Sequence, residues 1–192
     1  MKWIVLAIVI VIVPYTILTL RYRRPGKAFE PYADMKDRAN TLRLLSAGFQ
    51  RVSLEAQRPA ANSGANSGAT VSASAGGLPA SLKTTLVDAP LLPTEIVSVT
   101  AAPTAASGSA YIIQFACTLP DNKQQLAGAD LYLRGEEAII APTFEKLSGG
   151  LQTRTRENII LLTVPARALK PGKYHLTLVG QNASRAWPLQ VK

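Results

Sequence analysis

The last hundred residues alternate between apolar and polar side chains, and this pattern limits the fold more than any other feature of the chain. From about Leu91 onward, seven short alternating or apolar runs are separated by Pro and Gly, at 95–100, 111–117, 131–133, 138–141, 158–164, 174–178 and 187–191. Such runs are typical of strands in antiparallel sheets. We therefore expect residues 91–192 to fold as an antiparallel β-sandwich.

The two last runs show the alternation most clearly. In the first, Tyr174 shares a face with the leucines at 176 and 178, and His175 lies on the opposite face. In the second, Trp187 shares a face with Leu189 and Val191. Because side chains alternate across a strand, we expect Trp187 to anchor the core and His175 to face solvent.

The entry to the penultimate run carries Leu169, Pro171, Gly172 and Tyr174. This sequence resembles the late hairpin of bacterial immunoglobulin-like and fibronectin-like sandwiches. The resemblance implies an immunoglobulin-like fold in which the tyrosine hydroxyl bonds to nearby backbone, as in a tyrosine corner. It implies no particular activity, because sandwiches of this kind serve many functions.

Residues 3–20 form an 18-residue stretch without a charged side chain. As a helix it would extend about 27 Å, which is close to the bilayer core of about 30 Å. The stretch is longer than the core of a signal peptide, and residues 21–25 offer no small-x-small cleavage site. We therefore predict an uncleaved, single-pass transmembrane anchor with a basic flank over residues 1–24, which locates the protein in the cell membrane.

The basic flank supports two further expectations. Arg21, Arg23 and Arg24 directly follow the apolar stretch, and we expect them to contact anionic lipid headgroups. By the positive-inside rule, this charge places the C-terminal domain in the cytoplasm, whereas a small sandwich on a spacer is an arrangement familiar outside the cell membrane. Nucleic acid is not expected as a partner, because the net charge of +9 comes without interleaved aromatic residues or a binding motif.

An amphipathic helix is predicted from Asp34, a favoured N-cap residue, to about residue 51. Its apolar stripe, at spacings of 4, 3, 3 and 4, consists of Met35, Ala39, Leu42, Leu45 and Phe49. We expect Met35, Leu42, Leu45 and Phe49 to contact lipid, the β domain or a membrane-protein partner. Residues 25–58 form this juxtamembrane segment, and its end, 52–58, could be a short strand or a tail.

A flexible linker is predicted over residues 59–90. The part from 59 to 82 has no charge and is rich in Ala, Ser, Gly and Asn, with the sequence of 61–64 repeated at 65–68. Segments of this composition bury too little apolar surface to offset the entropy of ordering.

The residues that usually carry chemistry are scarce. One His, one Cys and two Met are too few ligands for a soft-metal site, and no nucleotide-binding or serine-hydrolase motif is present. Glu136 and Glu137 are adjacent on a predicted turn, so their side chains diverge. Cys117 shares a face with Ile113 and Phe115, which predicts a buried, unreactive thiol. We expect no catalytic residue, cofactor or metal.

These features favour a non-enzymatic interaction or scaffolding module, in which a tether presents the β domain to a partner. An alternative is an accessory or assembly subunit of a larger membrane complex, acting through the anchor and the helix over 34–51. A third possibility is a membrane-bound hydrolase whose carboxylates meet only in the folded chain.

Overall fold

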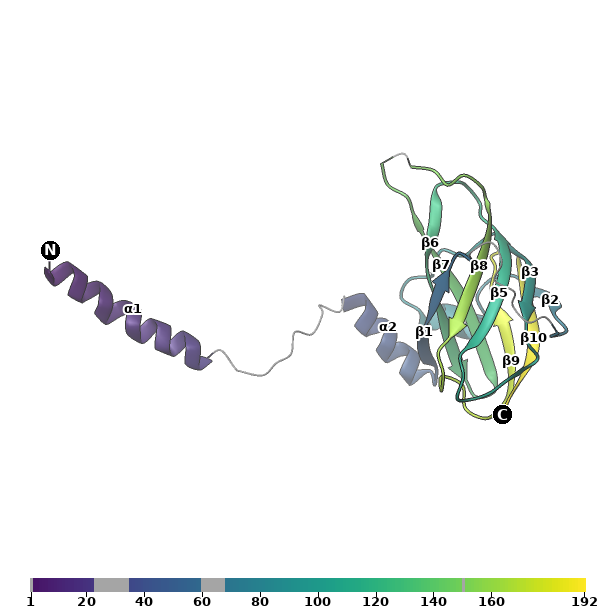
Figure 1. The fold of residues 1–192 in the computed structure, drawn as a ribbon, viewed down its shortest axis with the longest axis horizontal. Helices are drawn as coiled ribbons and strands as arrows, with labels where there is room; N and C mark the ends of the chain where they lie inside the picture. The colour runs from purple at the N-terminus through teal and green to yellow at the C-terminus, as the bar shows by residue number, and fades with distance from the viewer. Residues whose placement is uncertain (1, 23–34, 60–67, 150) are drawn as a thin grey trace. The chain divides into compact units, whose positions relative to one another are not determined.

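The computed structural model describes residues 2–22, 35–59, 68–149 and 151–192, without the side chains of 4–9, 19–22, 35 and 36 (Figure 1). The chain divides into two compact units, Met1–Met35 and Lys36–Lys192. The first unit contains helix α1 (Lys2–Tyr22), with Pro14 inside it.

The predicted transmembrane anchor is not borne out by the described helices. To cross a bilayer, a helix needs about 20 consecutive, predominantly apolar residues. Within the described parts of the chain, no helix is both long and apolar enough to meet this requirement. This finding overturns the single-pass transmembrane prediction for residues 3–20.

The second unit is a closed barrel of eight strands. In ring order these are β10 (Ala183–Val191), β3 (Glu95–Ala101), β5 (Tyr111–Thr118), β8 (Glu157–Val164), β1 (Gln50–Gln57), β6 (Gln124–Arg134), β7 (Glu137–Lys146) and β9 (Gly172–Leu178). The pairing of β9 with β10 closes the ring. Two shorter strands, β2 (Ser72–Ala75) and β4 (Thr104–Ala105), pair with β10.

The closed ring corrects the prediction of an immunoglobulin-like sandwich. All seven predicted strands are present, but they form one ring, and 50–57 supplies an eighth strand between β6 and β8. The alternation of side chains is the same in a sandwich and in a barrel, because both have one inner and one outer face. What distinguishes them is long-range pairing, such as the parallel register of Glu137–Ile140 with His175–Leu178.

The ring is weakest where β10 meets β3. Only one parallel backbone pair, Ala183 with Glu95, joins the two strands. Arg185 reinforces this junction, because its Nε donates to the carbonyl of Ile96 at 3.1 Å and its Nη2 donates to that of Val97 at 3.0 Å. A side chain thus supplies hydrogen bonds where the backbone ladder is short.

The barrel interior is filled by inward-pointing side chains from all eight strands. Trp187 is fully buried, which confirms its predicted place in the core. Its Nε1 donates to Tyr111 Oη at 3.2 Å, and Tyr111 Oη donates to the carbonyl of Ala102 at 2.7 Å. The tyrosine that bonds to the backbone is therefore Tyr111, rather than the predicted Tyr174.

A second apolar cluster covers the outer side of β6 and β7. It joins α2 (Met35–Ser46) and α3 (Ala80–Thr85) to the barrel and contains Leu44, Phe49, Leu82, Tyr132, Ile139, Ala141 and Val179. β7 is thus buried on both faces, which explains why residues 138–141 form a continuous apolar run.

The cluster also corrects the predicted flexible linker. Of residues 59–90, 60–67 lie outside the described residues, but 72–75 form β2 and 80–85 form α3. Leu82 is fully buried against the barrel. Packing of Leu82 into the outer cluster thus holds this segment against the barrel, although its composition predicted too little apolar surface for that.

Cys117 is buried inside the barrel, as predicted, and burial raises the pKa of its thiol from 9.0 to about 12. Because the folded-state pKa is the higher one, the neutral thiol stabilises the fold below about pH 9, and this contribution is lost as the pH rises towards 12. In Cys117→Ala, the free energy of unfolding should therefore fall less steeply with pH, by up to about 1.4 kcal/mol per pH unit. Urea unfolding of both proteins across this range measures the difference. Parallel curves would contradict the prediction.

Candidate binding groove

Helix α2 ends in a left-handed turn that fixes how the chain enters the barrel. Gly48 has a φ of 77°, a conformation that glycine adopts without steric cost. The Phe49 amide donates to the Leu44 carbonyl at 2.8 Å, and the Gly48 amide donates to that of Leu45 at 3.0 Å. This pair of hydrogen bonds is a Schellman motif. Such a motif is commonly accompanied by an apolar contact between a residue just after the helix and one in its last turn, and here these residues are Phe49 and Leu44. Both belong to the outer cluster and are about 1% exposed.

The turn divides the predicted apolar stripe. Phe49 lies beyond the end of the helix and is buried, whereas Leu42 and Leu45 are 68% and 62% exposed. Leu44, which the stripe did not include, takes the inward position. The predicted common face of Leu42, Leu45 and Phe49 is therefore wrong, because a helix that ends at Ser46 cannot carry Phe49.

Strand β1 follows the turn and places a polar cluster beside α2. Arg51 Nη2 donates to Asp130 Oδ2 at 2.8 Å, and Ser53 Oγ donates to Asp130 Oδ1 at 3.2 Å. The pairing of β1 with β6 sets Ser53 directly opposite Asp130. Asp37 of α2 approaches the same guanidinium at 3.5 Å. Both oxygens of Asp130 therefore have donors, whereas Asp37 makes one longer contact.

Burial and neighbouring charge shift the pKa values of Arg51 and Tyr132 away from neutral pH. The hydrogen bond to Asp130 raises the pKa of Arg51, so its guanidinium stays charged. Burial, together with the Asp130 carboxylate, raises the pKa of Tyr132 to about 12, so its phenol stays neutral. By formal charge, the two carboxylates of Asp37 and Asp130 and the one guanidinium of Arg51 sum to −1.

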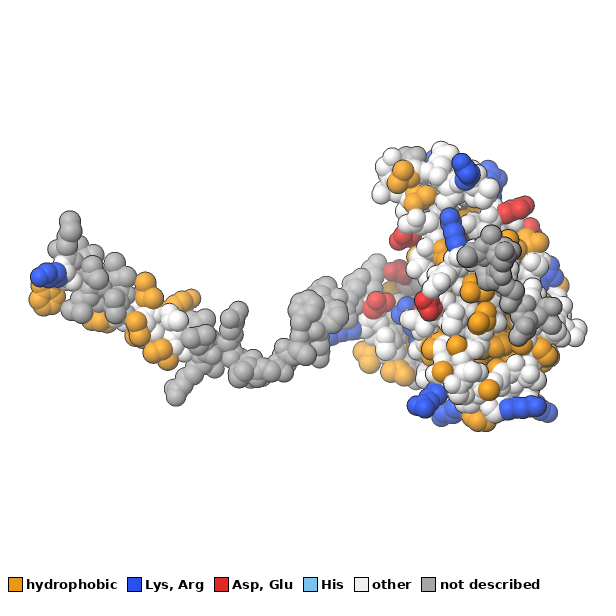
Figure 2. Space-filling view, in the orientation of Figure 1, with side chains coloured by type: hydrophobic (Ala, Val, Ile, Leu, Met, Phe, Trp, Pro, Cys, Tyr) orange, Lys and Arg blue, Asp and Glu red, His pale blue; other side chains and the backbone are white. Residues whose placement is uncertain are grey.

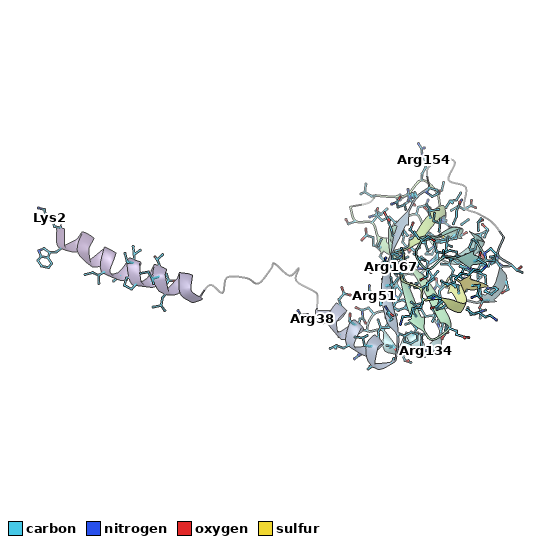
Figure 3. All side chains as sticks on the ribbon, turned by 60° about the horizontal axis from the view of Figure 1, so that its bottom comes forward. Lys2, Arg38, Arg51, Arg134, Arg154 and Arg167 are labelled. Atoms are coloured by element: carbon cyan, nitrogen blue, oxygen red, sulfur yellow. The ribbon has the colours of Figure 1, made fainter. Side chains whose placement is uncertain are left out.

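These residues border a groove of about 360 Å³. Its lining consists of Asp37, Thr41, Leu44, Leu45, Phe49, Gln50, Arg51 and Ser53. In Figure 3, Arg51 lies on the flank of the barrel next to α2. Beside the groove, the guanidinium carbon of Arg134 lies 4.5 Å from the centre of the Phe49 ring. The groove thus combines an apolar floor with a polar wall, on which the Asp37 carboxylate is 64% exposed.

The structure tests only some of the predicted contact residues. Arg23 and Arg24 lie outside the described residues, and the side chains of Arg21 in α1 and Met35 in α2 are likewise not described. Leu45 and Phe49 line the groove, whereas Leu42 is exposed on α2 and is not one of the lining residues.

Sequence reasoning missed Leu44, Arg51, Asp130 and Tyr132. A glycine at 48 could have indicated the contact between Leu44 and Phe49, since a Schellman motif joins positions with this spacing. The partnership of Arg51 with Asp130 has no comparable local signal, because 78 residues separate the two in the chain.

The hydroxyl of Ser53 and the guanidinium of Arg51 are both bonded to Asp130. Ser53 donates to a carboxylate that Arg51 already neutralises, so no base is available to activate its hydroxyl. Across the described residues, no three or more His, Cys, Asp or Glu side chains gather closely enough to hold a metal ion. The only histidine, His175, is exposed on β9.

Comparison with known proteins adds no relative from which a function could be transferred. No family model, curated protein or solved structure matches the chain. The function must therefore be argued from the surface of this molecule.

Proposed function

We propose that this protein is a non-catalytic interaction module that binds a partner protein in the groove beside α2. The observation that carries this proposal is the exposure of Leu45, which lines the groove together with Leu44 and Phe49. Leu42, one helical turn before it on α2, is exposed as well. Figure 2 shows hydrophobic side chains at the surface over α2. Exposed apolar side chains that border a groove are a common feature of protein-binding sites.

The charges of the groove favour a partner segment that carries a basic side chain among apolar ones. The positive charge of Arg51 is already neutralised by Asp130 at 2.8 Å, so Arg51 does not favour a further anion from the partner. The Asp37 side chain is 64% exposed, and among the described residues its ion-pair contact is the one with Arg51 at 3.5 Å. A Lys or Arg of the partner would complete the contacts of Asp37, while Leu or Phe side chains would cover Leu45 and the groove floor.

The size of the groove favours a short segment. Its volume of about 360 Å³ lies at the lower end of the range for binding pockets. Such a site accommodates a few side chains, for example those on one face of an amphipathic helix. We therefore expect a transient contact with a peptide-like segment.

Two synthetic amphipathic peptides test this site. They share one Leu/Phe face and differ only in whether Lys or Glu flanks it. Fluorescence anisotropy with the full chain should show tighter binding of the Lys peptide. Leu45→Glu should weaken that binding more than tenfold, because it removes an apolar contact and leaves a charge that the apolar face of the peptide would have to desolvate.

Two further variants serve as controls. Leu151→Glu changes another exposed leucine, 64% accessible and outside the groove, and should leave binding unchanged. Asp37→Asn should remove the preference for Lys over Glu while retaining the apolar contribution. Equal loss in Leu45→Glu and Leu151→Glu, or no preference for Lys, would refute the proposed site.

A further inference from the structure

One end of the barrel brings together basic residues from three segments. Arg167 lies in the connection between β8 and β9, and its amide donates to the Ser107 carbonyl at 2.9 Å. The Ser107 amide in turn donates to the carbonyl of Lys192, also at 2.9 Å. Next to Lys192, Val191 pairs with Gly172 and Gln190 pairs with Lys173. We call Arg167, Lys170, Lys173 and Lys192 the cationic end.

The segments that build this end contain no acidic residue. Residues 96–120 carry no charged side chain, and residues 158–192 carry five Lys or Arg and no Asp or Glu. All four residues of the cationic end are exposed, and none has a carboxylate partner within the described part of the chain. Figure 2 shows Lys and Arg side chains along the lower end of the barrel.

The adjoining turn between β6 and β7 does not neutralise this charge. The amide of His175 donates to the carbonyl of Glu136 at 2.8 Å, which places the turn beside β9. Within the turn, Arg134 and Glu137 pair with each other at 2.9 Å. Counting side chains alone, Glu136 contributes one negative charge against four positive ones, and a net side-chain charge of +3 remains.

The shape of the cationic end favours a flat, extended anion. The cavity at this end measures only about 10 Å³, which is too small to hold an inserted side chain. Tyr111 and Trp187 are buried and Tyr174 is half-buried, so these segments offer no exposed aromatic ring on which a nucleotide base could stack. Arg167 adopts a φ of 67°, a left-handed conformation that is uncommon outside glycine and concentrates at functional sites.

From this arrangement we propose that the cationic end docks on the anionic headgroups of a lipid bilayer. Each Lys or Arg close to such a surface contributes about a fivefold factor to binding, so a net charge of +3 gives an attraction of about a hundredfold. The attraction is purely electrostatic and reversible, and it falls as salt screens the charges. The cationic end shares no residue with the lining of the groove beside α2.

Vesicle co-sedimentation of the full chain tests the docking. Phosphatidylcholine vesicles with and without phosphatidylglycerol are compared, because their difference isolates the electrostatic part of binding. In Lys170→Gln/Lys173→Gln, the preference for anionic vesicles should fall about 30-fold. In the unmodified chain, the same preference should be lost at about 0.5 M salt.

A matched control removes the same charge elsewhere. Lys123 and Lys146 are exposed and lie beside each other where β6 begins and β7 ends, at the end of this hairpin that is away from its turn and from the cationic end. Lys123→Gln/Lys146→Gln should preserve the preference within about twofold. Thermal melting should be the same for both double variants, since all four side chains are exposed. Equal losses in the two variants, an unchanged preference in Lys170→Gln/Lys173→Gln, or tighter binding to duplex DNA than to anionic vesicles would each overturn the proposal. Leu45→Glu should leave vesicle binding unchanged, which separates this result from that for the groove.

Discussion

Replacing Trp187 by alanine is expected to lower the free energy of unfolding by about 3–5 kcal/mol. Trp187 is the largest fully buried side chain and lies within the barrel core. A closed ring of strands cannot easily collapse around the space that the indole leaves, so most of the cavity should persist. The change also removes the hydrogen bond of 3.2 Å that Trp187 Nε1 donates to Tyr111 Oη.

Trp187→Phe is the matched control, because it retains an aromatic ring and loses mainly volume and the hydrogen bond. It should cost clearly less than Trp187→Ala. Urea unfolding followed by circular dichroism measures both variants without depending on tryptophan fluorescence. A loss below about 1 kcal/mol for Trp187→Ala would show that the core is not packed around this residue.

The second large effect is expected at the ion pair beneath the groove. Arg51→Ala should cost about 2–3 kcal/mol, because it leaves the Asp130 carboxylate without its counter-charge. The side chain of Asp130 is only 14% exposed, so water can replace the guanidinium only in part. We place the cost below that of a fully buried pair because Arg51 itself is 33% exposed.

A double-mutant cycle separates the pair from its surroundings. Arg51→Ala/Asp130→Ala should cost less than the sum of the two single changes, because the double variant contains no stranded charge. Unfolding in urea gives the three free energies that the cycle needs. Strict additivity would mean that the contact of 2.8 Å contributes nothing to stability.

The strands could be predicted from the sequence, whereas their closure into a ring could not. Alternation reveals that Ile113, Phe115 and Cys117 share one face, and in the structure all three are buried. It contains no information on which strand lies beside which. The parallel register of β7 with β9, on which the ring depends, joins residues 38 positions apart and leaves no local trace.

The groove was predictable in part, because helix periodicity identifies faces but not helix ends. A stripe that ran through to Phe49 required the helix to continue past Ser46, and Gly48 ended it. The pattern thus identified Leu42 and Leu45 as apolar positions of the helix. The turn at Gly48 determines that Phe49 is buried while these two leucines stay exposed. The polar wall depends on the pairing of β1 with β6, which sequence reasoning did not include, since 52–58 had no assigned structure.

The junction of β10 with β3 has a consequence for how the chain reaches its native state. Strand β1 pairs only with β6 and β8, which come much later in the chain. The ring stays open until β10 has paired with both β9 and β3. Folding dominated by such distant pairings is slow, on the order of milliseconds to seconds. Until β10 arrives, β3 and β9 each present an unpaired edge, and such edges promote association between chains. The hydrogen bonds from Arg185 to the carbonyls of Ile96 and Val97 form only with this last junction, so they should slow reopening of the ring and re-exposure of these edges more than they speed its closure.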